Sequence, residues 1–162
     1  MKFFYKSLIF ALLSVIVIQA NGQNCRDYHI NNCRWGDPSF FYNRQSRSAL
    51  FSPGTTSKFK IIVYENEEYY IAINGHRKLG KINIKVSEDN ETKEELYDNS
   101  NFKFENHFFF QNEKTRKLIV KITTEESSSA KENSKKYCLG VLIEFRQMKG
   151  SNKNNNSKDI GF

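Results

Sequence analysis

Three cysteines, Cys25, Cys33 and Cys138, carry the most reactive side chains of this 162-residue sequence. In an oxidising compartment two of them are expected to pair. Cys25 and Cys33 are close in sequence, and closing even a short loop removes unfolded-state entropy, so the sequence favours this pair and leaves Cys138 reduced within an apolar strand. A long bridge from Cys25 or Cys33 to Cys138 is the alternative. The thiols form no C-x-x-C pair, so we predict no zinc site.

Catalytic chemistry has little support in the sequence. His29, His76 and His107 are far apart, and no G-x-S-x-G elbow or other nucleophile signature accompanies them. Acidic residues are common, but none lies in a recognisable glycosidase setting. The turn from Glu88 to Glu91 lacks the D-x-D-x-D-G spacing of a calcium loop and is interpreted as a solvated turn. We therefore predict a protein that is not an enzyme and uses no metal or cofactor.

Exposed aromatic side chains are the residues with which a protein binds sugar rings, because those rings present apolar C–H faces for stacking. The candidates for such a binding site are Trp35, Tyr64, Tyr70 and Tyr97. Tyr64 and Tyr70 alternate with Val63 and Tyr69, so they are predicted to face outward if one side of the sheet meets solvent. One exposed, coplanar strip of rings would indicate polysaccharide binding, whereas scattered or buried rings would indicate a protein partner.

The elements that must position these residues are β-strands. From Lys58 to Val86, apolar residues alternate with polar ones in three runs separated by turns, and β-branched and aromatic side chains dominate the runs. This period of two is typical of strands with one buried face. Similar runs elsewhere bring the total to about eight strands, with no convincing helical period after the amino-terminal segment. We predict an all-β fold, an antiparallel β-sandwich of the jelly-roll kind.

Two further patterns indicate where the core lies. Phe102, Phe104, Phe108 and Phe110 share one parity and form a phenylalanine stripe, which is predicted to be core because each buried ring removes a large apolar area from water. A ligand-binding face is the alternative for this stripe. The run from Tyr137 to Phe145 is largely apolar on both faces, which predicts a central strand.

The chain divides into four predicted segments. Residues 1–22 combine a basic start, a short apolar run and small residues before Gln23, which is typical of a signal peptide. Residues 23–38 form an irregular segment that contains two cysteines, and residues 39–148 form the β-sandwich domain. Residues 149–162 are polar and low in complexity, which predicts a disordered tail.

Charge and export limit the partners. Removal of Lys2 and Lys6 with the signal peptide lowers the formal charge from +7 to about +5, and acidic runs interrupt the basic residues. Nucleic-acid binding normally requires a clustered basic patch, so we predict none. The apolar run is also shorter than the roughly 20 residues that span a bilayer. The mature protein is expected to be secreted, periplasmic or bound at the cell surface, without a membrane span.

Five runs of sequence resemble the bacterial pre-peptidase C-terminal domain, over roughly residues 57–146. These runs are Glu68–Ile73, Lys81–Val86, Glu95–Asn99, Lys117–Ile122 and Tyr137–Glu144. The family is a secreted β-sandwich that is appended to exported proteases and other hydrolases and that resembles a jelly-roll carbohydrate-binding module. It has no catalytic residues to carry over, and the residues before the matched runs are not expected to form a catalytic domain.

The residues and this resemblance together predict that the protein is an exported, non-catalytic binding or interaction module. Its partner is expected to be an exported protein or an extracellular polysaccharide. Two alternatives remain at this stage: a carbohydrate-binding module, and a structural or assembly protein that associates with other exported proteins.

Overall fold

The computed structural model describes residues 25–92 and 94–148. The predicted signal peptide and the predicted disordered tail lie outside the described residues. The strands are β1 (Phe41–Tyr42), β2 (Arg47–Phe51), β3 (Thr56–Val63), β4 (Glu67–Gly75), β5 (Ile82–Glu88), β6 (Glu95–Asp98), β7 (His107–Asn112), β8 (Arg116–Thr124) and β9 (Tyr137–Gln147). The short helices are α2 (Tyr28–Asn32), η2 (Arg77–Leu79), η3 (Asn99–Phe102) and α3 (Ala130–Asn133).

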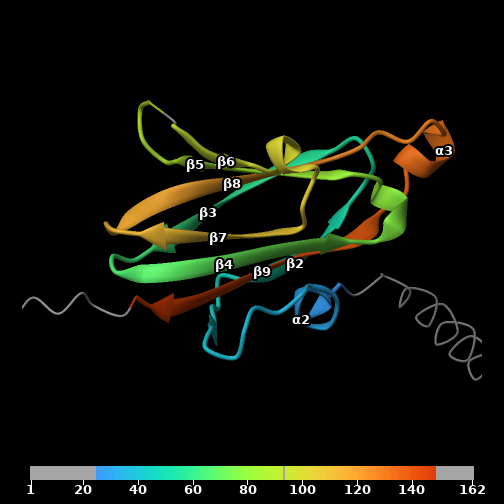
Figure 1. Ribbon diagram of the computed structural model, residues 1–162. Coiled ribbons are helices and arrows are strands. Elements are labelled where there is room, and N and C mark those ends of the chain that lie inside the picture. Colours follow the sequence, from blue (N-terminus) through green and yellow to red (C-terminus); the bar gives the residue numbers. More distant parts are fainter. Residues whose placement is uncertain (1–24, 93, 149–162) are drawn as a thin grey trace, which may run out of the picture.

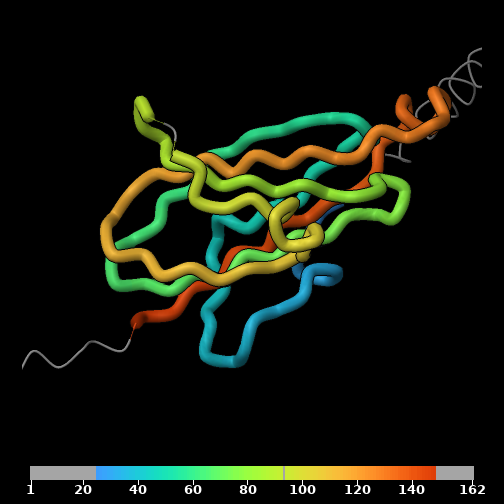
Figure 2. The backbone as a smooth tube through the Cα atoms, turned by 45° about the horizontal axis from the view of Figure 1, so that its top comes forward, coloured from blue at the N-terminus to red at the C-terminus, as the bar shows by residue number. Residues whose placement is uncertain are grey.

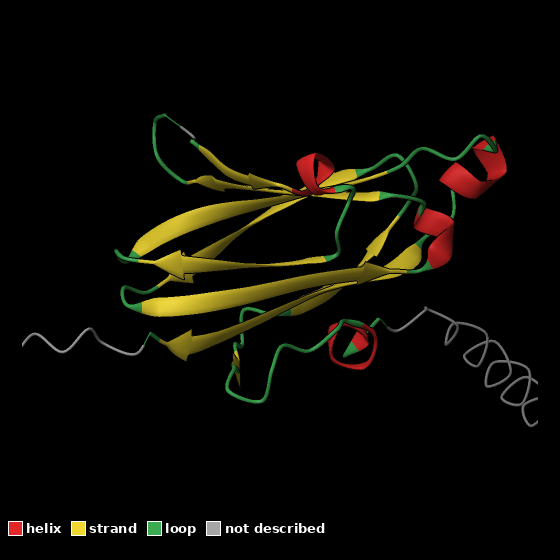
Figure 3. Cartoon of the chain, in the orientation of Figure 1, coloured by secondary structure: helices red, strands yellow, loops and turns green. Residues whose placement is uncertain are grey.

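Two antiparallel sheets pack face to face (Figure 1). Sheet A has the order β1-β9-β4-β7, and β2 also pairs with β9, whereas sheet B has the order β3-β8-β5-β6. The prediction of an all-β antiparallel sandwich is therefore confirmed. The described part of the chain holds nine strands, not about eight, and its helices lie around the rim and outer sides of the sheets (Figure 3).

The alternating sequence explains the core between the sheets. In β8, Leu118, Val120 and Ile122 are buried while the residues between them face away from sheet A. The same alternation in β3, β4, β5 and β9 supplies the other inward residues. Removing these side chains from water, at roughly 25 cal/mol per Å² of apolar area, is the main force that holds the two sheets together.

β9 is the central strand of sheet A, as predicted. It pairs with β4 on one side and with β1 and β2 on the other. Its outer face is covered by residues 25–40, which run outside both sheets (Figure 2). The buried residues of this second layer are Cys33, Phe40, Tyr70, Ala72 and Leu142. The segment predicted to be irregular therefore contains α2 and seals one face of the sandwich.

The predicted cysteine pairing is wrong. The disulfide joins Cys25 to Cys138, with a sequence separation of 113 residues. Cys33 is a buried free thiol whose Sγ donates a hydrogen bond to the Gly140 carbonyl at 3.4 Å. The physical reason is the position of residues 25–40, which we call the covering segment. Its helix α2 carries Cys33 into the second apolar layer, while Cys25 stays above β9.

The reactivity of the Cys33 thiol tests this arrangement. Burial raises its pKa to about 11, and only the thiolate attacks a disulfide reagent. We expect no reaction with Ellman's reagent at mildly alkaline pH in the folded protein, and one thiol per chain after unfolding in guanidinium without reductant. Rapid reaction of the folded protein would mean that the covering segment does not bury this residue.

The phenylalanine stripe is only partly core. Phe108 is buried and Phe110 is half-buried, as predicted, whereas Phe102 and Phe104 are exposed. The period breaks because the chain forms η3 at this point, and Lys103 and Phe104 adopt positive φ angles of 55° and 59°. A parity that is counted through such a turn carries no information about burial.

Candidate functional site

The four predicted aromatic binding residues do not form one strip. Tyr70 is 1% exposed, so its predicted role as an exposed platform is wrong. Tyr70 lies on the face of β4 opposite to Tyr69, as expected, but the covering segment lies on this outer face. The Tyr70 hydroxyl donates to the Arg34 carbonyl at 2.9 Å. The same ring lies 6.0 Å from that of Phe40.

The other three candidates lie on separate elements. Trp35 is exposed on the covering segment, where its Nε1 donates to the Ile30 carbonyl at 3.0 Å. Tyr64 is exposed in the turn between β3 and β4, and Tyr97 is half-buried in β6. Within residues 25–92 and 94–148, no ring contact joins any two of the four. The four rings therefore do not form the continuous platform that stacking on a sugar polymer would require.

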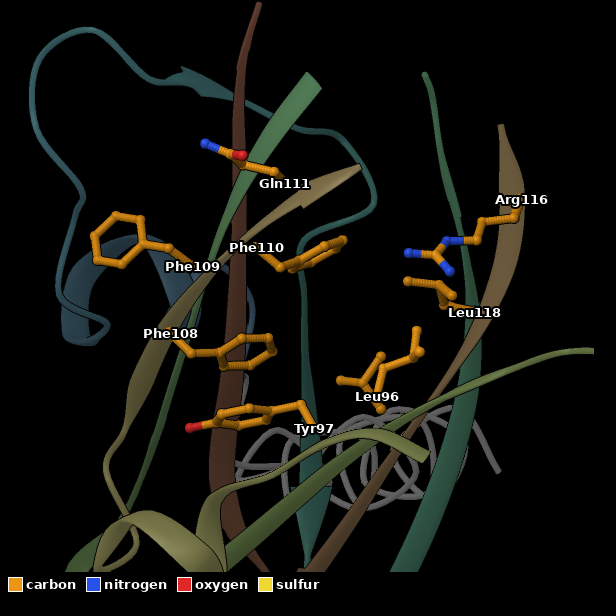
Figure 4. A pocket seen from close by; sticks show the side chains of 9 residues that line it. Leu96, Tyr97, Phe108, Phe109, Phe110, Gln111, Arg116 and Leu118 are labelled. Atoms are coloured by element: carbon orange, nitrogen blue, oxygen red, sulfur yellow. The ribbon is translucent and has the colours of Figure 1, made fainter. Parts of the chain in front are cut away.

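A different candidate site lies along one side of the sandwich, between the edge strands of the two sheets. β6 ends sheet B, β7 ends sheet A, and no backbone pairing joins these two strands in the described chain. A hollow of about 240 Å³ lies between them (Figure 4). Its lining residues are Val86, Leu96, Tyr97, Phe108, Phe109, Phe110, Gln111, Arg116 and Leu118. We call this hollow and its two edge strands the seam.

The period of two in β7 aims aromatic side chains into the seam. Phe108 and Phe110 point toward the hollow, whereas Phe109 and Gln111 point the other way (Figure 4). Tyr97 of β6 stacks on Phe108 with a ring separation of 3.8 Å and closes one end. The hollow is smaller than the roughly 300–1,000 Å³ of small-molecule sites, so its size suits one or two side chains of a longer ligand.

An ion pair closes the other end of the seam. Arg116, which lines the hollow, pairs with the buried carboxylate of Glu88, and Lys114 lies 3.3 Å from the same oxygen. The hydrogen bond from Arg116 lowers the pKa of Glu88, with a further contribution from Lys114. Arg116 Nε also donates to Asn112 Oδ1 at 2.9 Å, at the last residue of β7. The charge of Arg116 is therefore satisfied within the protein.

The edge formed by β7 lacks the usual protection against strand pairing. Proteins blunt exposed edges with charged residues, proline or a covering segment, yet residues 107–112 contain three phenylalanines and no lysine, arginine, acid or proline. The edge of β3 differs, because Gln45 Nε2 donates to the Ile62 carbonyl and Gln45 Oε1 accepts from the Ile62 amide, at 2.8 and 2.7 Å. β7 is thus open to a partner strand.

The histidines are not gathered in one site. His29 is buried, with Nδ1 2.7 Å from Ser48 Oγ and Nε2 3.0 Å from the Tyr42 hydroxyl, contacts that fasten α2 to β1 and β2. Burial lowers the pKa of His29. Over residues 25–92 and 94–148, no three His, Cys, Asp or Glu side chains are grouped so that they could hold a metal ion. Nor does any helix in these ranges have the length and apolar character to cross a membrane.

Comparisons with known proteins give a likeness to solved structures and nothing at the level of sequence families. No family model matches the sequence, and no curated protein matches it. The crystal structure of Aeromonas hydrophila PliG, a periplasmic lysozyme inhibitor of g-type lysozyme, is similar with a TM-score of 0.47 and 9% sequence identity. The match covers 70% of this chain and 92% of that chain. A likeness at this level does not indicate what this chain binds.

Proposed function

We propose that this protein is an exported, non-catalytic module that binds an extended segment of a partner protein along the seam. The observation that carries the proposal is the uncharged, aromatic edge strand β7 beside a hollow that is lined mainly by aromatic and aliphatic side chains. A partner strand would pair with the free edge of β7 and place an apolar side chain between Phe108 and Phe110. In such β-augmentation, backbone hydrogen bonds supply affinity and side-chain pockets supply specificity.

Two observations support an exported protein partner. The Cys25–Cys138 disulfide is of the kind that forms and persists in oxidising compartments. The predicted sugar-stacking residues are scattered or buried, so polysaccharide binding lacks a continuous platform. The resemblance to the pre-peptidase C-terminal domain stays a prediction, and it agrees with a non-catalytic role.

Photo-crosslinking in the exported fraction of the native host tests the proposal. A benzoyl-phenylalanine group placed at Leu96, which is 38% exposed at the hollow, should give an adduct with one partner protein. The same group at Ile62, which is 39% exposed on the capped β3 edge, should not. An adduct of twice the mass of this chain would show a second copy in the seam and contradict the proposed partner.

Charged residues on the two edge strands should abolish crosslinking. For this test the benzoyl-phenylalanine group is moved to Phe109, which is exposed on β7. We expect Leu96→Lys combined with Gln111→Lys to prevent its crosslink, because lysine on an edge strand opposes pairing and the ammonium group introduced at Leu96 would be costly to desolvate at the hollow. Both residues are exposed, so the free energy of unfolding should change by about 0.5 kcal/mol or less.

The matched control places the same substitutions elsewhere. Leu50→Lys combined with Asn31→Lys adds equal charge at exposed positions of β2 and α2, and it should leave the crosslink from Phe109 intact. Loss of the adduct in both double variants would show that added charge, not the seam, decides binding.

A further inference from the structure

The outer face of sheet B carries three lysines side by side. The strand register places Lys58 of β3 directly opposite Lys121 of β8, and Lys121 directly opposite Lys85 of β5. All three side chains point away from the core, because Phe59, Val120 and Val86 take the inward parity. We call Lys58, Lys121 and Lys85 the lysine row. Like charges that face each other across strands destabilise a sheet.

The protein neutralises only one end of this row. Lys85 Nζ lies 2.5 Å from Asp98 and 3.1 Å from Glu95, and these hydrogen bonds raise its pKa. Within the described ranges, Lys58 and Lys121 form no ion pair. The repulsion between these two lysines is therefore left for solvent or for a partner to relieve.

The surface at the row is concave and not purely polar. A hollow of about 280 Å³ is lined by the lysine row together with Ser87, Glu95 and Ile119. The half-buried Ile119 lies between Lys60 of β3 and Ser87 of β5 in the register. An exposed isoleucine, Ile62, follows along β3. The outward positions of β3, β5 and β8 contain no aromatic residue on which a sugar ring could stack.

We propose that the lysine row is a second interaction surface that binds an acidic, partly apolar segment of a protein. Two unpaired ammonium groups match carboxylates that are spaced across neighbouring strands, which lie roughly 4.8 Å apart. Ile119 lies two residues from Lys121 on the same face of β8, so it matches an apolar side chain next to those carboxylates. This face belongs to sheet B and is distinct from the seam, so the inference does not depend on what the seam binds.

Binding of defined peptides to the full mature chain tests the inference. A fluorescent peptide of alternating Glu and Leu should bind the wild-type protein, and Lys58→Glu combined with Lys121→Glu should weaken binding about tenfold, because rim charges act through electrostatic complementarity. Added salt should weaken the wild-type complex. A peptide of alternating Glu and Ser should bind more weakly, because it offers nothing to Ile119.

The control carries the same change in charge at another place. Lys131→Glu combined with Lys136→Glu alters exposed residues of the α3 region and should change peptide affinity less than about twofold. An equal loss in this variant would show attraction by net charge alone and overturn the proposal. Tighter binding of dextran sulfate than of the Glu–Leu peptide, with the same loss on reversal of the row, would overturn the assignment to a protein ligand.

A stability readout tests the repulsion itself without any ligand. Lys121 faces the unpaired Lys58 across β3 and β8, so Lys121→Glu replaces this repulsion with an attraction, whereas Lys85 is already paired with Asp98 and Glu95. We expect the thermal midpoint to rise by about 1–3 °C at low salt, and the gain to shrink as salt is added. A lower midpoint for Lys121→Glu would mean that the row carries no repulsion for a partner to relieve.

Discussion

Removal of the Cys25–Cys138 disulfide should destabilise the protein more than any other change considered for this chain. Cys25→Ala combined with Cys138→Ala releases a link across 113 residues, and the loop-closure entropy of a link this long corresponds to about 3–5 kcal/mol. The bridge also anchors the covering segment to β9, so its loss should expose the outer face of sheet A. Urea denaturation followed by fluorescence and circular dichroism measures the free energy of unfolding.

The matched control for this experiment is Cys33→Ala. This variant keeps the disulfide and removes only a buried thiol, so it should cost about 1 kcal/mol or less. The pairing predicted from sequence, Cys25 with Cys33, would instead make Cys33→Ala as damaging as loss of Cys25. Equal destabilisation by Cys25→Ala and Cys33→Ala would therefore contradict the observed bridge.

The second large effect is expected at Asn99, a fully buried amide at the start of η3. Asn99 Nδ2 donates to the carbonyls of Ile82 and Glu105, both at 3.0 Å. Its Oδ1 accepts from Asn83 Nδ2 at 2.9 Å and from the Ile84 amide at 3.0 Å. Asn99→Ala removes this partner from the carbonyls of Ile82 and Glu105 and from the Ile84 amide, whereas Asn83 Nδ2 keeps its hydrogen bond to Asp98. Each unsatisfied buried group costs about 1–3 kcal/mol. We expect a total loss of about 3–4 kcal/mol in the free energy of unfolding.

Asn101→Ala is the matched control, because it removes an amide side chain from the same helix η3 without touching the buried network of Asn99. Asn101 is exposed in the same short helix, so its truncation should change stability by about 0.5 kcal/mol or less. Similar losses for Asn99→Ala and Asn101→Ala would show that η3 as a whole, not the buried amide network, holds the end of β5.

The sandwich could be predicted because its strands alternate over long, uninterrupted runs. In the strand runs from Lys58 to Val86 and from Lys117 to Ile122, each side chain on the inward parity is part of the core or packed against it. The same reasoning failed at Phe102 and Phe104, where a 3-10 turn interrupts the strand. Local pattern is reliable only as long as the chain stays extended.

The outer layer could not be predicted, because it depends on contacts between distant parts of the chain. Strand parity placed Tyr70 correctly on the face opposite Tyr69, but parity does not reveal that residues 25–40 cover this face. The wrong cysteine pairing has the same cause. Short sequence distance favoured Cys25 with Cys33, whereas the position of α2 over β9 brings Cys25 to Cys138.

The seam was missed for a related reason. It forms where the ends of two different sheets face each other, and sheet order is not encoded in the local pattern of β6 or β7. One signal was present in the sequence: residues 106–112 contain no charged side chain, although 27% of the whole chain is charged. An uncharged aromatic strand in such a chain is a reason to ask what covers its edge.

Backbone amide hydrogen exchange in β7 is the measurement that most directly tests strand addition at the seam. In the complex with the partner protein captured at Leu96, the amides of residues 107–112 that face away from β4 should exchange more slowly than in the free protein, because a new strand would bond to them. The amides of β3 should be unchanged, since Gln45 already occupies part of that edge. Unchanged exchange in β7, with protection appearing elsewhere, would contradict strand pairing at the seam.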